Sequence, residues 1–236
     1  RFYELRHCAT IRPTMPELTL LLASQSPRRR EHLTLLGLPF TVTSADVDES
    51  TRDGELPADL ARRLSRAKAG AAAAELAVAP GVVIVACDTV VALGSAVLGK
   101  PVDGAEAASM LERLRGRTHE VLSAVTLLEP ATGDCVTDVA TTQVVMRDYS
   151  DAEIAEYVAS CDPLDKAGAY AIQHAGFHPV RAFQGCYLNV VGLPLCHVTR
   201  CLRDWDFAPT VDVPACCQAH THRVCDVFDS ILADMR

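Results

Sequence analysis

The sequence has little of several features that mark other classes of protein. Its 22 Lys and Arg residues face 30 Asp and Glu residues, for a formal net charge of −8. It therefore lacks the basic excess that is typical of proteins that bind nucleic acid. No apolar run approaches the about 20 residues that cross a bilayer, and the longest, residues 81–87, has the length of a strand. We expect neither nucleic acid nor a membrane as a partner.

Aromatic residues are scarce, at 5% of the chain, whereas cysteine is not, with ten residues. Ten cysteines in a short secreted protein would suggest disulfide bonds, but this chain is long and shows no signal peptide. Most of its cysteines lie in apolar segments such as residues 85–87. We therefore expect buried free thiols and a cytoplasmic location.

The periodicity of apolar residues predicts a mixed α/β fold. We predict strands at residues 18–23, 40–43, 82–87, 120–128, 135–146 and 180–183, a hairpin over 90–98, and helices at 28–36, 57–77, 105–114, 151–160 and 195–204. This order places long antiparallel strands in the middle of a mixed sheet. Residues 1–14 precede Met15 and are expected to lie outside the fold, residues 15–207 to form the domain, and residues 208–236 to form a tail rich in Cys and His.

Three consecutive arginines stand in the first turn of the predicted helix at 28–36. Ser26 is a good N-cap and Pro27 suits the first helical position. The positive end of the helix dipole disfavours cations there, so Arg28 and its two neighbours concentrate positive potential at the expense of helix stability. A phosphate chain would be bound by the helix N-terminus, the hydroxyls of Ser24 and Ser26, and the guanidinium groups together. A solvated basic patch is an equally good interpretation.

Two further residues are unusual for their positions. Lys68 falls in line with Leu60 and Leu64 on the apolar stripe of a helix, so it must either extend to solvent or meet an anion. Asp88 follows the apolar strand at 82–87 directly, which would place it at a sheet edge, where α/β folds bind ligands. It could bind Mg²⁺, orient water or act as a general base, or it could simply cap a turn.

Two loops carry groups that suit a nucleotide. Lys100 stands in a rigid turn between Gly99 and Pro101 and would act as a point charge for phosphate oxygens. The segment 165–173 mixes charges with small residues, which lets a backbone approach a ligand closely. Within it, Gln173 offers both a donor and an acceptor to the edge of a pyrimidine ring.

Taken together, these segments resemble the Maf family of nucleotide pyrophosphatases. The resemblance runs from about residue 20 to 207 and rests on motifs at residues 22–29, 67–69, 87–89, 99–101, 165–170 with Gln173, and 191–194. It implies a Maf/ITPase-like mixed, elongated sheet flanked by helices, with two lobes, a central cleft and commonly a homodimer. It also implies hydrolysis of a nucleoside triphosphate between its α- and β-phosphates, with a divalent metal, Mg²⁺ or Mn²⁺.

The resemblance also implies roles for single residues. Asp88 would activate water, with Glu49 and the metal assisting it. Substrate would be bound by Ser24, Ser26, Arg28, Arg29, Lys68, Thr89, Lys100, Lys166 and Gln173. Of these, Arg28, Thr89 and Gln173 occupy the specificity positions, in a combination similar to the branch that acts on dTTP and UTP. Alternatives are a nucleotide-sensing regulator of septum formation, or the same reaction on 7-methyl-GTP or another purine triphosphate.

The chain departs from the family pattern at His174, where relatives usually have Gly. If the backbone there needed a positive φ, His would be tolerated less well. Cys87, beside Asp88, is expected to pack and not to act as a nucleophile.

The predicted tail holds five side chains that could bind a soft metal within ten residues: Cys216, Cys217, His220, His222 and Cys225. Their spacing matches no standard zinc-finger pattern. We therefore favour a loosely ordered tail or a partner-binding helix over a metal site.

Overall fold

The computed structural model describes residues 19–44, 46–76, 81–205 and 207–233. The predicted upstream extension, residues 1–14, lies outside the described residues. A seven-stranded mixed sheet has the order β2-β1-β3-β5-β6-β7, and β4 pairs with β3. Its strands are β1 (Thr19–Ala23), β2 (Phe40–Thr43), β3 (Val82–Leu93), β4 (Ala96–Leu98), β5 (Thr118–Leu128), β6 (Cys135–Met146) and β7 (Val180–Gln184).

The helices are α1 (Pro27–Thr34), α2 (Pro57–Ala74), α3 (Gly104–Leu114), α4 (Asp151–Ala159), α5 (Tyr187–Val191), α6 (Leu195–Arg203), α7 (Val213–Thr221) and α8 (Phe228–Ala233), with short 3-10 turns η1 (Asp162–Asp165) and η2 (Ala167–Ala169). Four of the described helices, α1, α3, α4 and α7, begin directly after a residue whose side chain caps them. Ser26 caps α1 by accepting from the backbone N–H of Arg29, and Ser150 forms a capping box with Glu153 at α4. The mixed α/β prediction is confirmed. Within the described part of the chain no helix has the length and apolarity that a membrane span requires.

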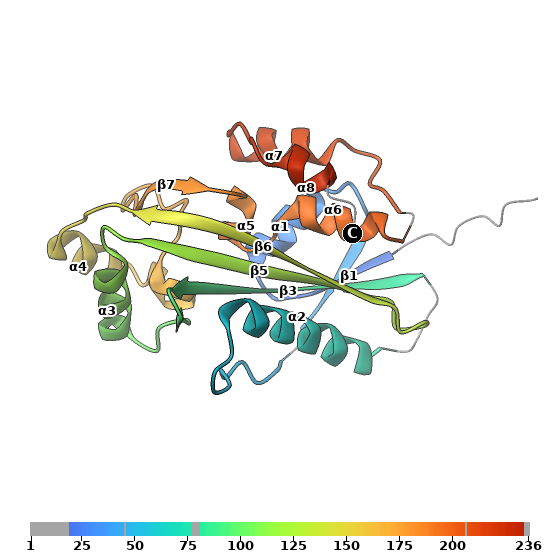
Figure 1. The fold of residues 1–236 in the computed structure, drawn as a ribbon, viewed down its shortest axis with the longest axis horizontal. Coiled ribbons are helices and arrows are strands. Elements are labelled where there is room, and N and C mark those ends of the chain that lie inside the picture. The colour runs from blue at the N-terminus through green and yellow to red at the C-terminus, as the bar shows by residue number, and fades with distance from the viewer. Residues whose placement is uncertain (1–18, 45, 77–80, 206, 234–236) are drawn as a thin grey trace, which may run out of the picture.

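The two faces of β3 are covered by different helices. Ile84 and Ala86 pack against α2 in one cluster, whereas Val83 and Val85 belong to the largest core cluster, which includes residues of α1, α5 and α6. In Figure 1, α2 lies on one side of the sheet, and α1, α5 and α6 lie on the other. β3 is covered on both faces, which agrees with a sequence that is apolar nearly throughout.

A second core lies at the other end of the long strands β5 and β6. Its buried members include Leu111 of α3, Ile154 of α4 and Tyr170, which follows η2. Figure 1 shows α3 and α4 at this end, away from α1, α2 and α6. The elongated sheet thus connects two packed lobes, as the family resemblance implied.

The prediction that Asp88 ends its strand is wrong. β3 continues to Leu93 because apolar residues follow Thr89, and Asp88 pairs with Ala124 in the middle of the strand. What ends near Asp88 is the neighbouring strand. The last residue of β1, Ala23, pairs with Ala86, and β4 joins the same edge of β3 only at Val91. No described strand pairs with this edge at residues 87–90, so the sheet has a gap there.

The expectation of a loosely ordered tail is also wrong for residues 208–233, while its alternative, a partner-binding helix, stays a prediction. Val213 of α7 is 2% exposed and belongs to the largest core cluster. Asp212 caps α7 by accepting from the N–H of Ala215. Both α7 and α8 pack against α6 (Figure 1). The C-terminal segment is therefore a folded addition to the lobe that holds α1 and α6.

Candidate active site

A cleft with a volume of about 980 Å³ opens along the gap in the edge of β3. It is bounded by the turn from β1 into α1, the loop before α2, one face of α2, β4, and segments around residues 165–173 and 190–192. All the predicted site residues line it: Ser24, Ser26, Arg28, Arg29, Glu49, Lys68, Asp88, Thr89, Lys100, Lys166 and Gln173. The structure thus brings together groups from motifs spread over some 150 residues.

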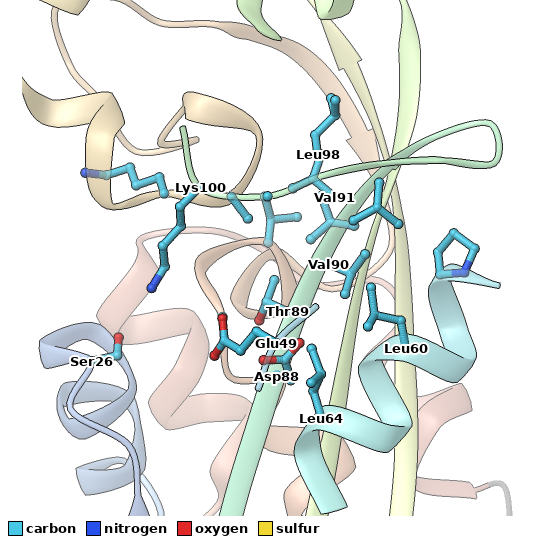
Figure 2. A pocket seen from close by; sticks show the side chains of 18 of the residues that line it. Ser26, Glu49, Leu60, Leu64, Asp88, Thr89, Val90, Val91, Leu98 and Lys100 are labelled. Atoms are coloured by element: carbon cyan, nitrogen blue, oxygen red, sulfur yellow. The ribbon is translucent and has the colours of Figure 1, made fainter. Parts of the chain in front are cut away.

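Asp88 forms a compact charged group with Lys68 and Glu49. The Nζ atom of Lys68 lies 2.6 Å from Oδ1 of Asp88 and 2.6 Å from Oε1 of Glu49. Figure 2 shows Glu49 and Asp88 close together, with Ser26 and Lys100 to one side and the apolar Leu64 to the other. The question left open for Lys68 is resolved, because this lysine meets anions and does not extend to solvent.

The opposite charges of Lys68 and Glu49 stabilise each other. Burial alone would lower the pKa of Lys68, but the carboxylates of Asp88 and Glu49 raise it above its usual value. Burial would likewise raise the pKa of Glu49, but the hydrogen bond and charge of Lys68 hold it below its usual value. Lys68 and Glu49 are therefore both held in their charged forms at neutral pH.

Arg29 of α1 connects two parts of the cleft by hydrogen bonds, one to residue 192 and one to β3. Its Nε donates to the carbonyl oxygen of Gly192 (2.8 Å), one terminal nitrogen donates to Oγ1 of Thr89 (3.1 Å), and the other donates to Oγ of Ser24 (3.4 Å). Thr89 is also within 2.8 Å of the hydroxyl of Ser123 on β5. A guanidinium with these partners fixes the shape of the cleft floor, in addition to supplying positive charge.

The segment at 165–173 is held by its own charges. Lys166 is 8% exposed, and its Nζ donates to the carbonyl oxygen of Asp162 (2.5 Å) and to the carboxylates of Asp162 (3.0 Å) and Asp165 (2.6 Å). The other carboxylate oxygen of Asp165 lies 3.8 Å from Arg28. Lys166 lines the cleft as predicted, but its ammonium is already committed to two carboxylates. It therefore shapes this wall.

The departure at His174 has no cost in backbone strain. The residues with a positive φ near it are Ala169 (57°) and His178 (45°), and His174 is not among them. Its ring nitrogen Nδ1 instead accepts a hydrogen bond from the N–H of Phe177 (2.9 Å). Cys87 is fully buried, and burial raises the pKa of its thiol, which fits packing and not nucleophilic attack.

Comparison with known proteins agrees with this geometry. A family model described as Maf-like protein matches residues 19–205. The chain belongs to the Maf-like protein family. A dTTP/UTP pyrophosphatase from Geobacter sulfurreducens is 44% identical over 184 residues, which cover 78% of this chain and 95% of the relative. One from Anaeromyxobacter dehalogenans is 47% identical over 186 residues, covering 78% and 92%.

A divalent cation suits the donors of this Maf-like site. The carboxylates of Glu49 and Asp88 both contact one positive group, the ammonium of Lys68. Carboxylate oxygens are also the protein ligands that Mg²⁺ prefers, with phosphate oxygens and water completing its shell. Within the described ranges, however, no group of three or more His, Cys, Asp or Glu side chains forms a metal site. The residues fit a metal that is bound jointly by the protein and the substrate.

The residues that support the floor of the Maf-like cleft were not predicted from the sequence. Ser123 donates to the carbonyl oxygen of Asn189 in α5 (3.1 Å), and the amide of Asn189 donates to Val121 and Thr142 (2.9 Å each). His119 is 2% exposed and lies 2.8 Å from the hydroxyl of Tyr170. The available signal was polar side chains within an apolar strand, since buried polar groups are kept where they have partners.

Proposed function

We propose that this chain hydrolyses nucleoside triphosphates, dTTP and UTP first among them, to the monophosphate and pyrophosphate. The observation that carries the proposal is the carboxylate of Asp88, held by Lys68 at the gap in the sheet edge, inside a cleft with a basic side and an apolar side. The relatives named above are dTTP/UTP pyrophosphatases, and their match to this chain covers almost their whole length. This supports the same substrate class here.

The charged side of the cleft suits the triphosphate. The N-terminus of α1 carries no acidic residue in its first turn, so the positive end of the helix can meet phosphate oxygens. Lys100 lines the same cavity and lies on the side of Ser26 (Figure 2). Arg28, Thr89 and Gln173 would then contact the base, and Gln173 matches the donor and acceptor edge of a uracil or thymine ring.

Asp88 would accept the proton of a water that attacks the α-phosphorus. The new P–O bond forms as the bond to the bridging oxygen breaks, and pyrophosphate leaves. Lys68 contacts the Asp88 carboxylate and can stabilise charge on the phosphates as it develops. Glu49 and Asp88 would hold the divalent metal, Mg²⁺ or Mn²⁺, which neutralises phosphate charge when it is bound.

The test is a panel of pyrimidine and purine triphosphates, with pyrophosphate release measured in Mg²⁺ and in Mn²⁺. We expect the highest kcat/KM for dTTP and UTP, and a loss of about 10²–10⁴-fold in Asp88→Asn. Asp134→Asn, in the exposed turn between β5 and β6, is the matched control and should keep full activity. A wild-type chain that leaves every triphosphate intact in both metals would refute the proposal.

Two further aspects follow from the family resemblance. We propose a homodimer, which light scattering on the purified chain would test, with a monomer as the contrary result. We also propose a reducing cytoplasmic setting, supported by thiols such as Cys87 and Cys186 that are buried and unpaired. Detection of the chain by cell fractionation outside the cytoplasm would contradict that location.

A further inference from the structure

The loop that carries Glu49 is an irregular part of the active-site wall. Residues 46–56 form neither helix nor strand, and residues 51–57 line the cleft together with Glu49. Glu49 lies beside Asp88 (Figure 2) and contacts Lys68, but 53% of its side chain is exposed. Asp88 is fixed by its place in a strand, whereas the position of Glu49 depends on how its loop is held.

Arg63 of α2 holds this loop at two points. Its Nε donates to Oε1 of Glu55 (2.6 Å), and a terminal nitrogen donates to Oε2 of the same carboxylate (2.8 Å). The same terminal nitrogen also donates to the carbonyl oxygen of Ser50 (2.8 Å). Two parallel bonds between a guanidinium and a carboxylate fix direction as well as distance. Because Ser50 directly follows Glu49, its bond to Arg63 anchors the backbone next to the Glu49 side chain.

The turn at residues 50–55 closes around the same carboxylate. Oε2 of Glu55 accepts from the N–H of Arg52 (3.1 Å), and the N–H of Glu55 donates to the carbonyl oxygen of Arg52 (3.0 Å). On the other side of Ser50, its N–H donates to Oδ1 of Asp48 (2.9 Å). The hydrogen bonds from Arg63 lower the pKa of Glu55 to about 2, so this carboxylate stays ionised at neutral pH.

The arginine next to Arg63 in α2 makes no comparable link to the loop. Arg62 pairs with Asp59 one turn earlier in the same helix (3.1 Å), and both side chains are exposed. Exposed ion pairs within a helix contribute little to stability. Arg62 therefore provides a control that has the same charge and the adjacent position.

Arg63 itself stands back from the reaction. It does not line the cleft, although Glu55 and Glu49 both do. Any effect of Arg63 on the reaction must therefore pass through the loop, and Glu49 is the loop residue that contacts Lys68.

We propose that Arg63 is a positioning residue for hydrolysis, which holds Ser50 and Glu55 so that Glu49 stays against Lys68 and beside Asp88. The inference rests on the proposed function, in which Glu49 and Asp88 hold the divalent metal. Without Arg63 the loop loses three hydrogen bonds, and Glu49 occupies its place in a smaller fraction of molecules. Groups that orient a metal ligand from behind typically change metal affinity or activity by about 10–100-fold.

The first test measures the loop without catalysis, by hydrogen exchange of the full chain mapped by mass spectrometry. In Arg63→Met the backbone N–H groups of residues 50–55 should exchange faster than in the wild type, because their turn has lost its anchor. The rest of α2 and β3 should exchange as before, which separates a freed loop from a misfolded chain. Arg62→Met should match the wild type throughout.

The second test measures hydrolysis of UTP with Mg²⁺. In Arg63→Met we expect kcat/KM to fall about 10–100-fold and the Mg²⁺ concentration for half-maximal rate to rise. Glu55→Gln, which weakens the same ion pair without changing α2, should show the same pattern. Arg63→Lys should recover part of the loss because it keeps the charge but not the paired bonds.

A double-mutant cycle decides whether Arg63 acts through Glu49. In a Glu49→Gln background, Arg63→Met should reduce kcat/KM by less than about 2-fold further, since the group that Arg63 positions has already been removed. A further loss as large as that in the wild-type background would overturn the proposal. Wild-type loop exchange in Arg63→Met, or equal activity of the Arg62 and Arg63 variants, would overturn it as well.

Failure of the proposed function looks different from failure of this inference. A wild type that hydrolyses no triphosphate would refute hydrolysis and with it the role of Arg63 in the reaction, whatever the loop does. An active wild type together with an equally active Arg63→Met would leave hydrolysis standing and refute only the positioning role.

Discussion

The ammonium of Lys68 and the carboxylate of Asp88 lie 2.6 Å apart inside the cleft, and both side chains are largely buried. Lys68 reaches this position from α2, while Asp88 is fixed in the middle of β3. Glu49, more exposed, contacts the same ammonium. The lysine therefore holds two carboxylates next to each other, because its positive charge contacts both.

Replacing Lys68 by Met should disturb both stability and activity. Without the ammonium, Asp88 and Glu49 repel each other, so the free energy of unfolding should fall by up to about 3 kcal/mol. The kcat/KM for UTP should fall about 10²-fold or more. Urea unfolding and pyrophosphate release measure the two effects. Lys68→Arg, which keeps the charge, should recover part of each, and wild-type activity in the Met variant would contradict the role given to Lys68.

Arg29→Lys should be far from conservative. A lysine cannot maintain the three directed bonds to Gly192, Thr89 and Ser24, so we expect a loss of about 1–3 kcal/mol in stability. We also expect a lower kcat from the loosened cleft floor. The adjacent Arg30 is exposed, and Arg30→Lys should change stability by less than about 0.5 kcal/mol. Equal effects of the two substitutions would argue against the proposed network.

Gly168→Ala should destabilise the wall of the cleft. Gly168 has a φ of 71°, and an added Cβ would lie 2.9 Å from Cγ1 of Val91. Strain and overlap together should cost about 1–3 kcal/mol, measured by thermal unfolding. Gly70→Ala is the control, because Gly70 is an exposed position of α2 and nothing lies within 4 Å of the added Cβ; it should stabilise by about 0.5–1 kcal/mol. Removing the overlap with Val91→Ala should rescue part of the Gly168 defect.

His119 should make stability depend on pH in a definite window. Burial lowers the pKa of His119 from 6.5 to about 4, so between these values the unfolded chain binds a proton that the folded chain does not. The free energy of unfolding should therefore be highest above pH 6.5 and fall as the pH drops towards 4. In His119→Gln this fall should be smaller by about 2 kcal/mol.

The control for the pH measurement is His178→Gln, which removes an exposed histidine and should leave the pH profile of unfolding unchanged. His32 contributes in the same direction as His119, because burial lowers its pKa to about 4. The slope in the His119 variant should thus be reduced and not abolished. A variant with the wild-type slope would contradict the assignment.

Local signals in the sequence were enough for most of the fold. Ser26 and Pro27 marked the start of α1, and Ser150 marked the start of α4, because capping depends on a few adjacent residues. The alternation and length of apolar runs located β5 and β6 within two residues of their ends. α5 was missed, since its five residues are too few to show a helical period.

The errors arose where pairing between distant segments decides the outcome. The strand was predicted to end at Asp88 only because this residue is polar. β3 continues beyond Asp88, and β5 pairs along it from Ile84 to Ala92. A loose C-terminal segment was expected because its Cys and His residues match no standard zinc-finger spacing. Its helices α7 and α8 bury little by themselves. Their attachment depends on α6, which the local sequence does not reveal.

The alternation of β3 has a consequence for how this family can vary. Asp88 faces α2 and Lys68, whereas Thr89, one residue on, faces Arg29 and Ser123. An insertion or deletion of one residue between 82 and 88 would exchange these two faces for every later residue of the strand. It would also shift which residues stand in the gap between β1 and β4. Insertions and deletions should therefore accumulate in loops such as the β5–β6 turn, whereas β3 can accept substitutions but no change in length.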